Sequence, residues 1–157
     1  MSDEAQQLIA EIEDQEKRLV FPHFDEADAW ALGSLLVKLA TARGLPVAVD
    51  IRRGEQQLFH AGLAGSTADN DAWIERKVRV VYRFASSSFL IGRQLAAKGR
   101  ELGPAMGVDP TLFAAHGGAF PVRIAGVGVV GVVTVSGLPQ AEDHALVVEA
   151  ISTFLGS

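Results

Sequence analysis

Apolar residues with helical spacing predict helices near both ends of the chain. Residues 3–18 place leucine and isoleucine on one side and acids on the other, and Ser2 can cap this helix. A second helical pattern follows Asp25 or Asp28, either of which can be its cap. Residues 140–155 repeat the helical spacing with leucine, valine, isoleucine and phenylalanine. The ends of the chain are therefore expected to be helical.

Strand patterns lie between these helices and predict two hairpins. Residues 47–52 and 57–60 form the first, and residues 120–125 and 127–136 form the second, joined through glycines that suit a tight turn. The strand at 127–136 is apolar at almost every position, which is typical of a central strand buried on both faces. Gly131 leaves a notch in it, and we attribute the notch to close packing of another backbone rather than to a ligand.

The segment between the two hairpins fits helical and strand periods almost equally well. Three polar residues, Asp69, Asn70 and Asp71, offer caps for a helix that begins near Ala72. Residues 73–84 alternate as a strand would, but they also carry helical spacing, and we predict a helix. A further helix is expected up to about Leu102, followed by a loop over 103–110.

Composition narrows the classes of protein that this chain can represent. A length of 157 residues, 48% of them hydrophobic, is typical of one domain with a real core, so we expect a single domain over 1–157. The chain has no cysteine, which excludes disulfides, thiolate metal sites and a cysteine nucleophile. The acidic N-terminus does not resemble a secretory signal, and the longest apolar run, 124–135, is too short to span a bilayer. We expect a cytoplasmic protein.

Charge is distributed unevenly along the sequence. Residues 76–100 contain seven bases and no acid, whereas the first 28 residues contain nine acids and two bases. A pI near 5.3 argues against a nucleic-acid partner, which would require an extended basic surface. The basic segment has two interpretations. It is a solvated helix face that pairs with the acidic N-terminal helix of the same or another subunit, or it is a site for a carboxylate or phosphate group.

Polar residues gather before and after the second hairpin. His116 precedes two glycines at one strand end, and Ser136 to His144 follows the other strand. The segment from Asp69 to Lys77 adds a helix start, an aromatic side chain and two cations. If the three segments converge, they form one pocket lined by Asn70, Trp73, Lys77, His116 and either Asp143 or His144. The alternative is that these residues cap helices and tie the last helix to the sheet.

Catalytic signatures are weak in this sequence. Ser86 to Ser88 have no obvious base or acid nearby in the sequence, so nucleophilic catalysis is not expected. His116 is a candidate metal ligand, but no tight spacing of ligands accompanies it. The residues alone assign no reaction and no catalytic residue.

Five segments match a known family in order along the chain. They are 47–50, 69–77 (DNDAWIERK), 84–88 (FASSS), 116–122 (HGGAFPV) and 135–144 (VSGLPQAEDH). The sequence resembles the GlcG/HbpS-like family, often labelled haem-degrading, and is most similar to its uncharacterised bacterial and fungal branch. The resemblance implies a profilin-like α/β (α+β) fold with a central antiparallel sheet of about five strands flanked by helices, and a homo-oligomer built from dimers. The expected ligand-binding residues are Asn70, Trp73, Arg76, Lys77, Ser87, His116, Gly117, Gly118, Ser136, Asp143 and His144.

Two functional hypotheses follow from the resemblance and the residues together. In the first, the protein binds haem or a related tetrapyrrole. Arg76, Lys77 or Arg83 would then pair with propionates, and His116 or His60 would approach the iron. In the second, the protein is a non-catalytic assembly or small-anion-binding protein that uses the same cluster of residues.

Overall fold

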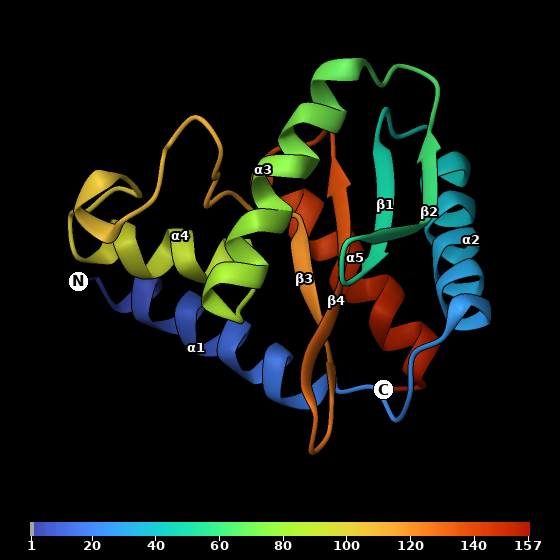
Figure 1. Ribbon diagram of the computed structural model, residues 1–157, viewed down its shortest axis with the longest axis horizontal. Helices are drawn as coiled ribbons and strands as arrows, with labels where there is room; N and C mark the ends of the chain where they lie inside the picture. Colours follow the sequence, from blue (N-terminus) through green and yellow to red (C-terminus); the bar gives the residue numbers. More distant parts are fainter. Residues whose placement is uncertain (1) are drawn as a thin grey trace.

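The fold is a four-stranded antiparallel sheet with helices on both faces (Figure 1). A computed structural model describes residues 2–157. The helices are α1 (Asp3–Arg18), α2 (Glu26–Ala42), α3 (Ala68–Phe84), α4 (Ser88–Ala97) and α5 (Gln140–Leu155), with a short 3-10 turn at Pro104–Met106. The strands are β1 (Ala48–Arg53), β2 (Gln56–Gly62), β3 (Ala119–Ile124) and β4 (Gly128–Ser136). No helix of residues 2–157 is both long and apolar enough to cross a membrane.

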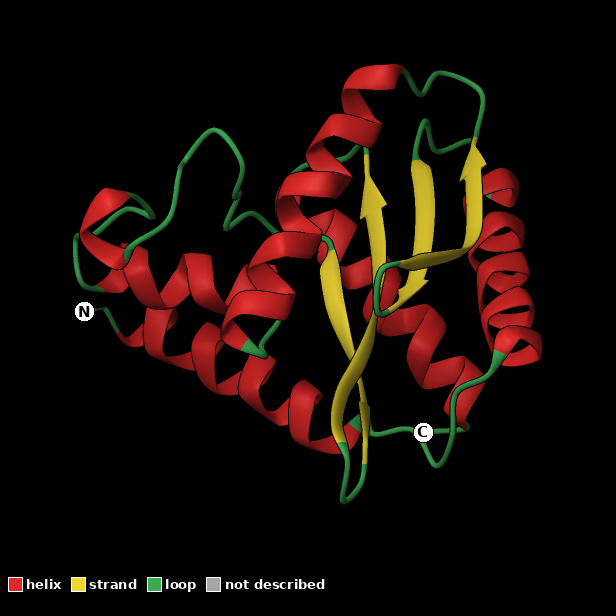
Figure 2. Cartoon of the chain, in the orientation of Figure 1, coloured by secondary structure: helices red, strands yellow, loops and turns green. Residues whose placement is uncertain are grey.

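The sheet has the order β2-β1-β4-β3, so β4 is central as predicted (Figure 2). Residues Ala48 and Ser136 pair across β1 and β4, and Ala119 and Thr134 pair across β3 and β4. A Cβ atom added at Gly131 would lie 2.2 Å from the Arg52 carbonyl oxygen. The notch in β4 therefore accommodates a neighbouring backbone, as expected.

The α+β class is confirmed, but the expectation of about five strands is wrong. At the outer edge of β3 the chain makes one parallel bridge, between Phe21 and Ile124, in place of a strand. Ile124 is the last residue of β3 and the chain bends at Pro22, so the pairing does not extend. The sheet consequently has four strands.

Two apolar layers cover the sheet. Helices α2 and α5 pack on one face, where Leu32, Leu36 and Ile151 meet the inward side chains of β1 and β4. Helix α3 packs on the other face through Ile74 and Val78. Helices α1 and α4 pack together beyond β3 (Figure 1). The predicted helical stripes are thus core faces.

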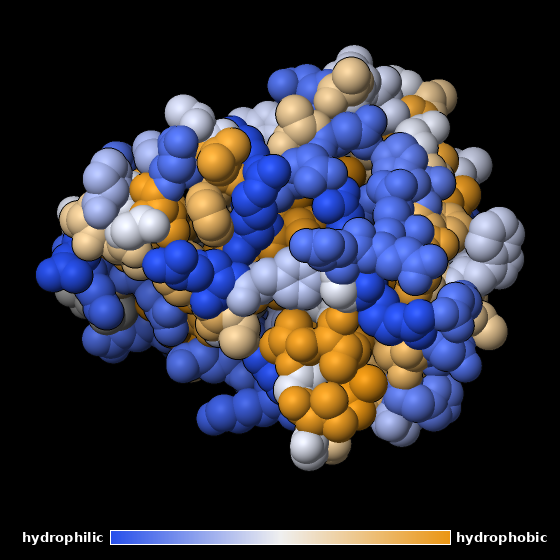
Figure 3. Space-filling view, in the orientation of Figure 1, coloured by the Kyte–Doolittle hydropathy of each residue, from blue (hydrophilic) through white to orange (hydrophobic). Residues whose placement is uncertain are grey.

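Burial of the central strand is incomplete at its first residues. Val127 belongs to the turn before β4 and is 71% exposed, and Val129 is only half-buried. The far end of the β3–β4 hairpin extends past the helices that cover the rest of the sheet, and apolar side chains are visible there at the bottom of Figure 3. The prediction of a fully buried strand from 127 is wrong for this end.

Helix starts depend on caps that the sequence identified in part. Ser2 caps α1, and Asp25 and Asp28 form a reciprocal capping box at α2, as predicted. The third helix begins at Ala68 instead of near Ala72, because Thr67 and Asn70 form a capping box one turn earlier. Helix α4 ends at Ala97 instead of near Leu102. Gly99, a residue of low helix propensity, follows two positions later.

Arginines of α3 do not pair with the acidic helix α1 of the same chain, contrary to one interpretation of the basic segment. They donate instead to carbonyl oxygens of the loop between α4 and β3. Arg76 reaches the Pro110 oxygen at 2.9 Å, Arg79 reaches the Leu112 oxygen at 2.9 Å, and Arg83 reaches the Met106 oxygen at 3.5 Å. These contacts fix the loop against α3.

Candidate functional site

Three segments that lie far apart in the sequence converge on one pocket. They are the first turns of α3, the loop before β3 and the turn from β4 into α5. The pocket has a volume of about 280 Å³, and we call it the His116 pocket. Its lining comprises Asp69, Asn70, Trp73, Lys77, His116, Ser136, Gly137, Leu138, Gln140 and Asp143. The structure therefore brings together the five residues expected in one pocket, with Asp143 rather than His144 among them.

A buried ion pair forms the back of the His116 pocket. Lys77 and Asp143 are 3% and 1% exposed, and the Lys77 Nζ atom lies 3.2 Å from Asp143 Oδ2. Lys77 also donates to the Val135 carbonyl oxygen at 3.3 Å. Asp143 accepts from the backbone N–H groups of Leu138 at 3.0 Å and Gly137 at 3.3 Å. The pair thus joins α3, β4 and the start of α5.

Burial dominates the electrostatics of this pair. It raises the pKa of Asp143 to about 6 and lowers the pKa of Lys77, because both charged forms lose hydration, while the opposite charge of the partner counteracts each shift. With a pKa of about 6, Asp143 is mostly ionised at neutral pH. The contacts of this pair support the alternative interpretation, in which these residues tie the last helix to the sheet.

Gly118 makes the close approach of these elements possible. Its φ of +137° is one that residues with a side chain rarely adopt. A Cβ atom there would lie 2.3 Å from the Val135 oxygen and 2.7 Å from the Lys77 Nζ atom. The neighbouring Gly117 donates its N–H to Gln140 Oε1 at 3.0 Å. Both glycines support the pocket from behind, and neither lines it.

His116 is placed by an aromatic contact rather than by a hydrogen bond to a carboxylate. Its ring packs edge-on against Trp73 at 5.3 Å between centroids, and the Arg76 guanidinium lies 4.7 Å from the Trp73 ring centre. Partial burial lowers the pKa of His116, and the nearby positive charges of Lys77, Arg76 and Arg93 lower it further. The imidazole is therefore neutral at pH 7, the form that can bind a metal through a ring nitrogen.

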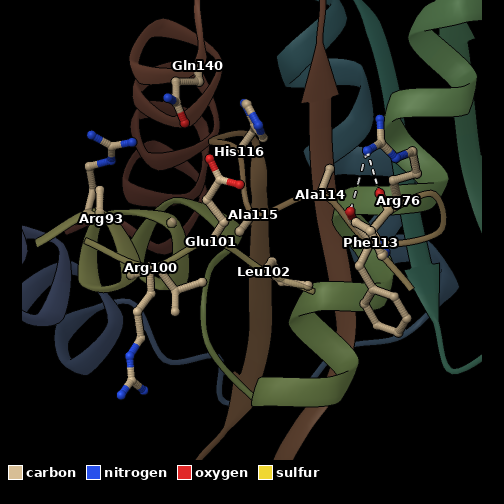
Figure 4. A pocket seen from close by; sticks show the side chains of 14 residues that line it. Arg76, Arg93, Arg100, Glu101, Leu102, Phe113, Ala114, Ala115, His116 and Gln140 are labelled. Atoms are coloured by element: carbon tan, nitrogen blue, oxygen red, sulfur yellow. Dashed lines mark hydrogen bonds between the residues drawn. The ribbon is translucent and has the colours of Figure 1, made fainter. Parts of the chain in front are cut away.

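A second hollow adjoins the His116 pocket, and His116 and Gln140 line both (Figure 4). It has a volume of about 360 Å³ and lies between α3, α4 and residues 100–115. Three arginines, Arg76, Arg93 and Arg100, line it together with Glu101 and several apolar side chains, so we call it the arginine hollow. The pocket and the hollow form one composite cleft around His116.

Several residues expected at the site lie elsewhere. Ser87 caps α4 by accepting from the Leu90 N–H at 3.1 Å. His144 packs between Phe89 and Phe120, and its Nε2 atom lies 2.7 Å from Gln15 Oε1. Burial lowers the pKa of His144 to about 4. A ligand-binding role for these two residues stays a prediction, which the pocket does not support.

The other candidates for haem binding are also separated from the cleft. His60 pairs with Asp71 at 2.7 Å in a different depression, formed by β1, β2 and α3. Arg83 is directed to the loop carbonyl of Met106. Within residues 2–157, the side chains close enough together to hold a metal ion are His23, Asp25 and Asp28 at the surface, and His116 is not among them.

Sequence reasoning missed the residues that complete the cleft. Leu138 and Gln140 lie inside the motif VSGLPQAEDH, which was a usable signal, because a strand-to-helix turn presents its side chains at the sheet end. Arg93 lies in the basic segment 76–100, which one interpretation made an anion site, but nothing in the sequence placed it beside His116. Glu101 had no such signal, and it enters the hollow because the segment after α4 folds back over α3.

Comparison with models of protein families identifies the family of this chain. The family model described as Haem degrading protein HbpS-like matches residues 24–152. The chain belongs to the HbpS-like family. This HbpS-like protein is 62% identical over 148 residues to the UPF0303 protein SCO2848 of Streptomyces coelicolor, and the match covers 94% of each chain. The resemblance to the GlcG/HbpS-like family is confirmed.

Solved structures agree with this assignment. The crystal structure of the Ybr137w protein is 34% identical and has a TM-score of 0.83, with 94% of this HbpS-like chain and 87% of the other covered. A crystal structure of a PduOC:heme complex shares the fold with a TM-score of 0.68 at 16% identity, with 82% and 93% covered. That second protein binds heme in its crystal.

Proposed function

We propose that this protein binds a small acidic ligand in the composite cleft around His116, and that haem or a related tetrapyrrole is that ligand. The observation that supports the proposal is the position of His116. A neutral histidine stands on the wall shared by the His116 pocket and the arginine hollow, with cations on either side of it.

The residues present fit a haem group. His116 would supply a ring nitrogen to the iron, because its imidazole is uncharged at neutral pH. The arginines of the hollow would face the propionates, since a guanidinium pairs with a carboxylate in a fork of two hydrogen bonds. Trp73 and Leu138 on one side and Leu102 and Phe113 on the other offer apolar contact for a macrocycle. When bound, haem supplies redox-active iron.

A haemin titration tests this proposal. Purified protein with added haemin should develop a Soret band distinct from that of free haemin, with saturation at one haem per chain. His116→Ala should weaken haemin binding at least tenfold and shift the band, because the iron loses its nitrogen ligand. His60→Ala is the matched control, since His60 lies outside the cleft.

Two results would contradict haem binding. One is a haemin spectrum that does not change when protein is added. The other is equal loss of binding in the His116 and His60 variants, which would indicate adsorption at the surface. Circular dichroism and melting temperature of both variants confirm that each is folded before the titration is interpreted.

A second candidate function is binding of a small anion without iron. The uncompensated arginines of the hollow favour it, because they need no metal to attract a carboxylate or phosphate. The two functions differ in one measurement. His116→Ala removes haemin binding, whereas an anion held by arginine alone keeps its affinity in that variant.

Assembly and location are part of the same proposal. We propose a homo-oligomer built from dimers in the cytoplasm, and the exposed apolar end of the β3–β4 hairpin supports an interface between subunits. Light scattering over a dilution series should give more than one chain per particle. A monomer mass at every micromolar concentration would contradict it.

A further inference from the structure

The arginine hollow contains more positive charge than its surroundings balance. Arg76, Arg93 and Arg100 line it, and Glu101 is its one acid. None of the three arginines is within ion-pairing distance of a carboxylate in the described residues, 2–157. Elsewhere in the same chain, Arg43, Arg52, Arg53 and Arg123 all have acidic partners. Within residues 2–157, Arg79 and Arg83 also lack an acidic partner, but they donate to loop carbonyl oxygens and do not line the hollow.

Hydrogen-bond donors in the hollow are also left without acceptors. The Nε atoms of Arg76 and Arg93 are buried and have no hydrogen-bond partner among residues 2–157. Buried donors of native proteins are almost always paired, so an unpaired one next to a cavity indicates a missing acceptor. Arg76 already donates its Nη2 atom to the loop carbonyls of Pro110 and Phe113, which leaves only part of its fork free (Figure 4).

Arg93 keeps its whole fork available. Its guanidinium lies over the Phe89 ring, 5.7 Å from the ring centre, and this contact occupies no N–H group with an acceptor. Nε and one terminal nitrogen of an arginine together form the edge that holds two oxygens of a carboxylate or phosphate. Gln140 holds Gly117 through its Oε1 atom, so its amide NH₂ is a second donor on the shared wall.

We propose that the arginine hollow is an oxyanion subsite in which Arg93 holds a carboxylate or phosphate group of the ligand. This inference deepens the proposed function. It rests on the proposed function because it places the rest of the ligand past Gln140, next to His116. The ligand class is then an organic acid or phosphate ester whose anionic end enters the hollow. Arg93 is the specificity-determining residue of this end.

The test uses a fluorescent reporter that the protein already contains. Its two tryptophans are Trp30, which is exposed on α2 and packs on Phe59, and Trp73, which touches His116 and Arg76. In a Trp30→Phe background, Trp73 alone reports on the cleft. Inorganic phosphate and citrate are titrated separately at constant ionic strength set with sodium chloride, so that the phosphate and carboxylate sources are distinguished.

At least one of the two anions should change Trp73 fluorescence with saturation. Arg93→Gln should weaken that binding at least tenfold, and Arg93→Lys should weaken it partly, because a lysine keeps the charge and loses the fork. Lys98→Gln is the matched control. It removes the same charge from the end of α4 and does not line the hollow, so affinity should stay within twofold of the parent.

Two outcomes overturn the proposal. The first is absence of saturable binding by phosphate and by citrate. The second is equal affinity in the parent and in Arg93→Gln, with both folded by circular dichroism. Arg93 also lines a depression beside the start of α1, so a purely structural role would lower the melting temperature and leave anion affinity unchanged. Haemin binding that persists in either case leaves the proposed function standing and rejects the subsite alone.

Discussion

Two arginine environments on opposite sides of helix α3 differ in one respect, namely the presence of acidic partners. Arg52 on β1 donates to Asp50 at 2.8 Å and to both Glu75 oxygens at 2.5 and 3.1 Å. Gln57 completes this network by donating to Asp50 at 2.6 Å. In the arginine hollow, by contrast, Arg93 has no carboxylate within ion-pairing distance in residues 2–157.

The comparison distinguishes charged side chains that are paired within the fold from charged side chains that have no acidic partner. Hydrogen bonds from the Arg52 guanidinium to Glu75 and Asp50 raise the pKa of Arg52, so the network holds its charges in place. The network joins β1 to α3 and directs all three Arg52 nitrogens to carboxylates. Arg93 has no acidic partner in residues 2–157, so we expect its charge to contribute little to the stability of the fold.

The largest expected effect is on stability at the paired site. Arg52→Met leaves the fully buried Asp50 carboxylate without its cation, which should lower the free energy of unfolding by about 3–5 kcal/mol. Urea denaturation measures this difference. Arg93→Gln is the comparison, and it should cost less than about 1 kcal/mol because it breaks no ion pair. Equal losses in the two variants would remove the distinction between the two environments.

An intermediate effect is expected at the ion pair behind the His116 pocket. Lys77→Met removes the cation beside Asp143 and should cost about 2–3 kcal/mol, less than at Arg52 because Asp143, with a pKa of about 6, can take up a proton and become neutral. Adding Asp143→Asn to this variant should restore at least about 1 kcal/mol. Additive losses in the double variant, measured by urea denaturation, would show that the two residues do not act as a pair.

An effect that appears only at acidic pH concerns a buried polar side chain, His144. Burial lowers its pKa from 6.5 to about 4, so the unfolded chain binds one more proton between these values. The stability that this group contributes is complete above pH 6.5 and falls as the pH decreases to 4, by at most about 3 kcal/mol. His144→Leu removes this dependence.

Asp143 changes stability in the opposite direction over nearly the same range. Its folded-state pKa of about 6 is above the ordinary 3.8, so its contribution is present below pH 3.8 and is lost as the pH rises to 6. The difference between the wild-type and His144→Leu unfolding curves from pH 4 to 7 cancels the Asp143 contribution. A difference that is constant with pH would contradict the assignment to His144.

The sequence predicted those parts of the fold that depend on local pattern. Helices α1, α2 and α5 and the two hairpins follow from periodicity and turn residues. The start of α3 was missed because the capping box uses Thr67, which stands before the three acidic or amide candidates. The fifth strand was expected by resemblance, and the chain makes a single bridge there because β3 ends at Ile124.

The candidate site likewise has one part that the local sequence pattern predicted and one part that it did not. The His116 pocket was predictable because glycines and polar side chains at strand ends converge in an antiparallel sheet, and Gly118 and Asp143 are such residues. The arginines of the hollow lie in the basic segment 76–100, and one interpretation of that segment was an anion site. The hollow itself was not predictable, because residues 100–115, which form one of its walls, have no periodic pattern. Contacts such as Arg79 with the Leu112 carbonyl place this loop, and they exist only in the folded chain.

The order of the strands has a consequence for how the chain acquires its shape during synthesis. The N-terminal part can form the β1–β2 hairpin early, but a two-stranded hairpin is only marginally stable by itself. The central ladder pairs Ala48 with Ser136, so it cannot begin until β4 leaves the ribosome. Helix α3 is synthesised before that point, and its core residues Ile74 and Val78 have no complete sheet to pack against until then. Nascent chains of this protein are therefore expected to expose an apolar helix face from the synthesis of α3 until β4 is available.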